Sequence, residues 1–142
     1  MRRVLVVLAA IVVFSSGMVA SATADQDPTQ AIAVALADGD GRLAAQLIAA
    51  SGFGTQPDKL GHTIFVGGNL AVAAGSGEAY RDAVAYGFTR GGVSLANATL
   101  TFSAAATEVV AAGLTPEQAL VGGTTVVQTY EAYAICVLGC PN

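Results

Sequence analysis

The two cysteines are the residues whose spacing points most directly to chemistry. Cys136 and Cys140 are the only cysteines and stand four residues apart. In an oxidising compartment they would pair with each other, and Gly139 and Pro141 would help the chain bend around so short a loop. On the chain-entropy model, closing this loop stabilises the fold by roughly 2 kcal/mol. The spacing predicts a local structural disulfide, with a bridge between two chains as the alternative. A redox-active pair is disfavoured because such pairs usually have the closer Cys-x-x-Cys spacing.

The single histidine is the second candidate for chemistry. His62 follows Asp58 by four residues, a spacing at which a carboxylate can orient a general base. The sequence has no G-x-S-x-G motif to supply a nucleophile. It therefore favours a non-enzymatic protein, with a small hydrolase that uses His62 as a less favoured alternative. Because His62 is far from both cysteines in sequence and no set of four ligands is visible, we expect no metal ion and no cofactor.

A short acidic motif at residues 38–41, Asp-Gly-Asp-Gly, has the carboxylates and glycines that a calcium site uses. An EF-hand loop also needs a glycine at its sixth position and a glutamate at its twelfth. This chain has Leu43 and Ala49 at those positions. The motif is instead typical of a polar turn between two helices.

Residues 1–24 have the three parts of a secretory signal peptide. Arg2-Arg3 precedes an uncharged apolar run from Val4 to Phe14, and Ala22-Thr23-Ala24 forms an A-x-A cleavage site. We therefore expect a secreted or periplasmic protein in which residues 25–142 form one small Ala/Gly-rich domain. The alternative is an uncleaved membrane anchor. No later segment has the continuous apolar run of about 20 residues that a membrane span needs.

Charge and composition narrow the class of partner. The net charge of −4 becomes −6 once both arginines of the leader are removed, and the four remaining basic residues are scattered. Nucleic acid binding needs a clustered cationic surface, so we expect none. The chain is 54% hydrophobic and only 11% charged, with no Trp. Such a chain either offers apolar surface to a protein partner or a second copy, or packs its small Ala and Gly residues closely inside.

Two helices are predicted before residue 55. Asp27 is suited to cap the first helix and Pro28 to begin it, and the apolar run continues through Ala37. The second helix, from Arg42 to Ala50, places Leu43 and Leu47 on one face together with Ala44 or Ile48, and Gly52 is suited to end it.

The middle of the chain allows two interpretations. We expect a loop from Thr55 to Gly61, around Pro57. Residues 63–74 begin with β-branched and aromatic residues before Gly67-Gly68, so they form either a short hairpin or a glycine-weakened helix. Ser76 is suited to cap a further helix from Gly77 to Tyr86.

The last third also mixes helix and strand signals. Residues 95–104 alternate apolar and polar side chains as a strand does, yet Leu95, Phe102 and Val109 also fit a helix that continues to Ala112, and length favours the helix. Residues 115–118, Thr-Pro-Glu-Gln, have the signature of another helix start. A final helix over Thr124–Leu138 would place four residues on one face, although its first four residues also suit a strand. These four are Val127, Tyr130, Ala134 and Val137.

Together these signals predict a mainly α fold, a single small helical domain that follows a signal peptide. The alternative is an α+β fold with a short hairpin and with strands near residues 63–66, 95–104 and 124–133. We expect a secreted or periplasmic non-enzymatic protein that acts through an apolar interaction surface, as an assembly subunit or accessory factor. A monomeric module that binds an apolar ligand or peptide is the alternative function.

Overall fold

The structure is a computed structural model that describes residues 27–113, 120–121 and 124–139. Within these ranges the chain is mainly α, with six α-helices and one short 3₁₀ helix. The helices in chain order are α2 (Pro28–Ala37), α3 (Gly41–Ser51), η1 (Phe53–Thr55), α4 (Pro57–Ala74), α5 (Gly77–Arg90), α6 (Leu95–Ala111) and α7 (Val126–Gly139). Two strands of two residues each, β1 (Leu120–Val121) and β2 (Thr124–Thr125), pair antiparallel just before α7, with Leu120 opposite Thr125 and Val121 opposite Thr124.

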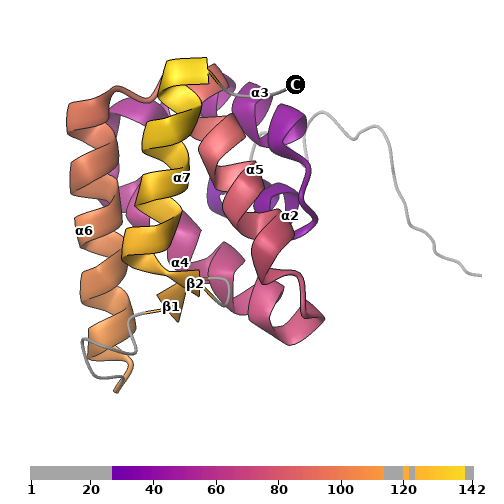
Figure 1. Cartoon of the computed structure of the whole chain (residues 1–142), viewed down its shortest axis with the longest axis vertical. Coiled ribbons are helices and arrows are strands. Elements are labelled where there is room, and N and C mark those ends of the chain that lie inside the picture. The colour runs from indigo at the N-terminus through magenta and orange to yellow at the C-terminus, as the bar shows by residue number, and fades with distance from the viewer. Residues whose placement is uncertain (1–26, 114–119, 122–123, 140–142) are drawn as a thin grey trace, which may run out of the picture.

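The helices pack in a small bundle around one core. Helix α4 packs against α2 and α6, while α5 packs against α3 and α7. Figure 1 shows α7 in front of the bundle, between α6 and α5. The largest fully buried side chains come from most of these helices and include Ile32, Ile48, Ile64, Tyr80, Phe88 and Tyr133. The six α-helices therefore share one core.

Small residues let the helices approach closely. A Cβ at Gly61 of α4 would lie 2.6 Å from the Ala104 Cβ and 2.8 Å from the Thr101 carbonyl oxygen of α6. A Cβ at Gly87 of α5 would likewise lie 3.1 Å from the Ala44 Cβ of α3. At Gly61 any side chain would push the two helices apart, and at Gly87 it would crowd Ala44. Much of the Ala and Gly content therefore serves close internal packing, which was one of the two interpretations of the composition.

Local signals confirm the first two helices. The Asp27 carboxylate accepts a hydrogen bond from the Thr29 backbone N–H at 3.0 Å, and Asp40 accepts one from the Leu43 N–H at 3.1 Å. Gly52 ends α3 in the left-handed conformation with φ of +76°. The predicted polar turn at residues 38–41 connects the two helices, and its second aspartate caps α3. These starts and stops depend on neighbours in sequence, which is why the sequence predicts them well.

The loop predicted around Pro57 is wrong, whereas for residues 63–74 and 95–104 the helical interpretation is the correct one and the strand alternative is wrong. Helix α4 begins at Pro57, so residues 55–61 are not a loop, and it continues through residues 63–74 where a hairpin was considered. Residues 95–104 lie in α6, so the α+β alternative fails there as well. Helix α5 is also four residues longer than predicted, ending at Arg90. Helix α4 forms despite its β-branched residues and paired glycines because it packs closely against its neighbours. A Cβ at Gly67, for example, would lie 3.0 Å from the Ala33 carbonyl oxygen of α2.

Some predictions fall outside the described residues. They are the signal peptide at residues 1–24, the helix start at residues 115–118, and Cys140. Within the described ranges, no helix has both the length and the apolar character needed to cross a membrane.

Candidate interaction surface

Helix α7 presents its inner face to the bundle through three residues. Thr129, Tyr133 and Cys136 are buried, and they recur at the spacing of successive helical turns. The Tyr133 hydroxyl donates a hydrogen bond to the Val93 carbonyl at 2.9 Å, and its ring meets that of Phe88 edge-on with centroids 6.2 Å apart. The predicted common face of Val127 and its partners is not the buried one. The aromatic Tyr133, with a buried acceptor for its hydroxyl, sets the rotation of the helix.

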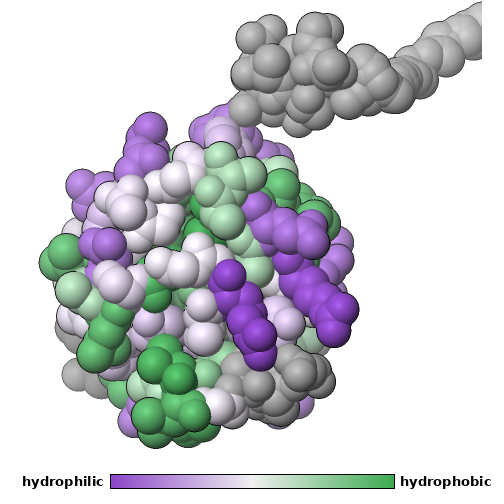
Figure 2. Space-filling model, turned by 90° about the horizontal axis from the view of Figure 1, so that it is seen from above, coloured by the Kyte–Doolittle hydropathy of each residue, from purple (hydrophilic) through white to green (hydrophobic). Residues whose placement is uncertain are grey.

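Large aliphatic side chains lie on the outside of α7. Val127 is 64% exposed, Ile135 68%, Val137 50% and Leu138 90%. We call these four residues the α7 outer face. The only charged residue of α7 is Glu131. Figure 2 shows hydrophobic atoms gathered at the lower edge of the molecule seen from above, the side on which α7 lies in Figure 1.

Helix α6 packs against α7 and carries an exposed apolar side chain at its start. Tyr130 of α7 contacts α6 through the Phe102 ring, at a centroid distance of 5.5 Å, and through the Thr99 hydroxyl at 3.2 Å. Tyr130 contacts Phe102, whereas Tyr133, later in α7, reaches Val93, earlier in the chain. Helix α7 therefore runs antiparallel to α6. Val137 lies two turns beyond Tyr130 on the same side of α7. Leu95, which begins α6, is 57% exposed.

A groove of about 880 Å³ lies between the α2–α3 turn, α5 and α7. Its apolar wall includes Tyr86, Ala132 and Ile135, and its charged lining includes Arg81 of α5. The Arg81 Nη2 lies 3.5 Å from an Asp82 carboxylate oxygen and 3.8 Å from that of Glu78. Its Nε is enclosed and has no hydrogen-bond partner among the described residues. The groove combines an apolar wall with a guanidinium that is only loosely paired.

A second groove, of about 570 Å³, lies along α2 and α3. We call it the α2–α3 groove. Its aliphatic lining includes Val34, Leu43 and Leu47, and its three acidic residues are Asp27, Asp38 and Asp40. The pKa of Asp27 is lowered because the Thr29 backbone N–H and hydroxyl stabilise its carboxylate. Among the described residues, no group of three or more His, Cys, Asp or Glu side chains is placed to hold a metal ion.

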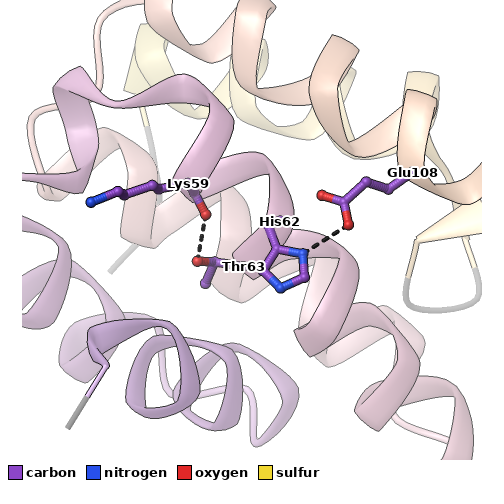
Figure 3. A network of polar contacts seen from close by, with 4 residues as sticks. All are labelled: Lys59, His62, Thr63 and Glu108. Carbon is purple, nitrogen blue, oxygen red and sulfur yellow. Dashed lines mark hydrogen bonds and ion pairs between the residues drawn. The ribbon is translucent and has the colours of Figure 1, made fainter.

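His62 pairs with the carboxylate of Glu108, which the sequence did not suggest as its partner. Its Nδ1 lies 2.7 Å from the Glu108 Oε1 of α6, as Figure 3 shows, so the acid that meets it is not Asp58. Both side chains are solvent-accessible, at 52% for His62 and 34% for Glu108. The nearby Thr63 hydroxyl is buried and donates to the Lys59 carbonyl at 2.8 Å. The pair therefore connects α4 to α6, and the adjacent hydroxyl is already engaged.

Glu108 lies 46 residues from His62, and no local sequence pattern connects the two. The α7 outer face was missed for a different reason. Only two of its residues, Val127 and Val137, were predicted to share a face of the helix, and the exposure of all four depends on which side Tyr133 turns inward. Cys136 is 4% exposed and lines the groove between α5 and α7. Because Cys140 lies outside the described residues, the Cys136–Cys140 disulfide stays a prediction.

No protein-family model matches this chain, and neither a curated protein nor a solved structure matches it.

Proposed function

We propose that this chain is a secreted or periplasmic non-enzymatic protein that binds another protein chain through the α7 outer face, as an assembly subunit or accessory factor. One observation carries the proposal. Four of the eleven large hydrophobic side chains exposed among the described residues lie on this one helix. The other seven are spread over α2, α3, α4 and α6.

The free energy available from burying the α7 outer face is that of a modest interface. Fully burying one Val, Leu or Ile contributes about 1.5–3 kcal/mol. With the exposures given above, covering all four residues would contribute roughly 4–8 kcal/mol. Association itself costs on the order of 4–15 kcal/mol, so this surface suits a partner that adds polar contacts or further apolar area. Leu95, which begins α6, is a further exposed apolar side chain outside α7.

The composition of α7 fits a protein partner better than a nucleic acid or an anionic lipid surface. Glu131 is its only charged residue, and residues 25–142 have no basic cluster that would attract a nucleic acid or an anionic lipid surface. Interface centres are poor in charge and rich in large apolar side chains. The signal-peptide pattern of residues 1–24 supports the choice of compartment.

A second candidate function is the binding of an apolar ligand or peptide in the groove between α5 and α7. Its volume of about 880 Å³ lies within the usual range for small-molecule sites. The apolar wall of Tyr86, Ala132 and Ile135 would hold the apolar part of a ligand. The loosely paired Arg81 guanidinium would contact a polar end.

The proposal is tested by the solution mass of residues 25–142, measured by size-exclusion chromatography with light scattering over a range of concentrations. If the partner is a second copy, the mass rises with concentration, and Ile135→Lys returns it to that of one chain. Leu100→Lys on α6 is the matched control, because Leu100 is 57% exposed but belongs to no part of the α7 outer face. A rising mass that Ile135→Lys leaves unchanged would contradict the role of this surface in self-assembly.

A further inference from the structure

The α2–α3 groove has a distinctive chemical character. Its aliphatic lining includes Val34 and Leu43, which are 40% and 42% exposed, together with the half-buried Leu47. Its acidic groups lie at both ends of α2, because Asp27 precedes that helix and residues 38–40 follow it. No basic residue among those that the structure describes lines it. An occupant that fits would be apolar along its length and cationic at an end.

The chain itself contains such a segment. Residues 4–14 are an unbroken run of eleven apolar residues, and Arg2 and Arg3 stand immediately before it. None of the ten acidic residues of the chain lies before residue 25. The segment is thus the chemical complement of the groove, with two cations at one end of an apolar run.

The lengths also agree. Helix α2 has ten residues, and at 1.5 Å per residue it is about 15 Å long. Eleven residues in helical form would span about 16 Å. Residues 15–26 leave twelve residues to reverse direction, and extended they would reach at most about 40 Å. If the segment lies antiparallel to α2, its arginines come to the end that carries Asp38 and Asp40, and residue 14 comes near Asp27.

We propose that residues 2–14 of the unprocessed chain occupy the α2–α3 groove, with Arg2 and Arg3 paired to the aspartates at residues 38–40. Removal of residues 1–24 would then uncover the groove in the mature protein. This contact is separate from the α7 outer face and stands whether or not that face binds a partner.

The test measures how fast a thiol in the groove reacts in the full chain, residues 1–142. Leu43→Cys places the thiol on the lining of the groove, and mass spectrometry after proteolysis distinguishes it from the native cysteines. The rate of maleimide labelling is compared with that in the same protein carrying Arg2→Glu and Arg3→Glu. We expect labelling to be at least ten times slower when both arginines are present. Leu100→Cys on α6 is the control, and it should label equally fast in both proteins.

Equal labelling rates at Leu43→Cys in the two proteins would overturn the proposal. Protection that increases with protein concentration would overturn it as well, because the occupant would then come from a second copy. A second reporter guards against a local effect of the first substitution. Val34→Cys, on the α2 side of the same groove, should show the same protection. Circular dichroism of each variant confirms that the helices are intact before rates are compared.

Discussion

The contact between α4 and α6 and the outside of α7 use apolar residues in opposite ways. Between α4 and α6, the absent side chain of Gly61 lets the helix approach Ala104 so closely that a Cβ would lie 2.6 Å from it. On α7, Ile135 and Leu138 are large, and they are 68% and 90% exposed. The small residues therefore hold the bundle together, whereas the large ones outside α7 contribute little to it. A hydrophobic composition alone does not distinguish these two uses.

The largest expected effect tests the close approach of α4 and α6. Gly61→Ala should destabilise the fold by about 1–3 kcal/mol, because the new Cβ meets both Ala104 and a backbone carbonyl, and neither can move aside without separating the helices. The measurement is the free energy of unfolding in urea. Gly139→Ala in α7 is the matched control, since nothing lies within 4 Å of its Cβ position. There the change should be neutral or stabilise by up to about 1 kcal/mol. Equal effects at the two glycines would show that the close approach does not matter.

The inner face of α7 should rank next. Tyr133→Phe removes the hydroxyl that donates to the buried Val93 carbonyl, and the unfolding free energy should fall by about 1–2 kcal/mol. Tyr130→Phe is the comparison, because the Tyr130 hydroxyl meets an exposed Thr99 hydroxyl and its loss should cost less than about 0.5 kcal/mol. A Tyr130 effect as large as that of Tyr133 would mean that the rotation of α7 is set by its contact with α6.

Alkaline pH should weaken the fold through two buried tyrosines, Tyr80 of α5 and Tyr133 on the inner face of α7. Burial raises the pKa of Tyr80 and of Tyr133 above the ordinary value of 10.0. Below pH 10 both residues are neutral in the folded and the unfolded chain, so they cause no change there. Above it, the unfolded chain loses these protons first, and stability falls as the pH rises further. Urea unfolding at pH 8, 10 and 11 should therefore show a loss only at the higher values. A stability that stays constant up to pH 11 would contradict the burial of these hydroxyls.

The smallest expected effect is at the surface pair that joins α4 to α6. Replacing His62 by Ala should change the unfolding free energy by less than about 1 kcal/mol, because the pair is exposed to solvent and screened. Any activity of the protein should also be unaffected. A loss of activity without a loss of stability would revive the hydrolase interpretation, with Glu108 in place of Asp58 as the acid that orients His62.

The sequence predicted the parts of the fold that depend on near neighbours. The cap at Asp27, the polar turn at residues 38–41 and the glycine at position 52 follow from side-chain hydrogen bonds and backbone preferences within four residues. The helical form of residues 63–74 does not, because it depends on the close packing of α4 against α2 and α6. The contact between His62 and Glu108 and the rotation of α7 are long-range for the same reason. A pattern of apolar residues predicts an apolar face on a helix, but the neighbouring helices determine which face is buried.

The most direct measurement of the central claim is site-specific photo-crosslinking in cells that export the protein. A photoreactive amino acid replaces Ile135 on the α7 outer face in one variant and the equally apolar Leu100 on α6 in the other. The account predicts a protein adduct at position 135 and none at position 100. An adduct twice the mass of one chain would identify a second copy, and any other mass would identify a different partner. No adduct at position 135, or equal adducts at both positions, would contradict an interaction surface on α7.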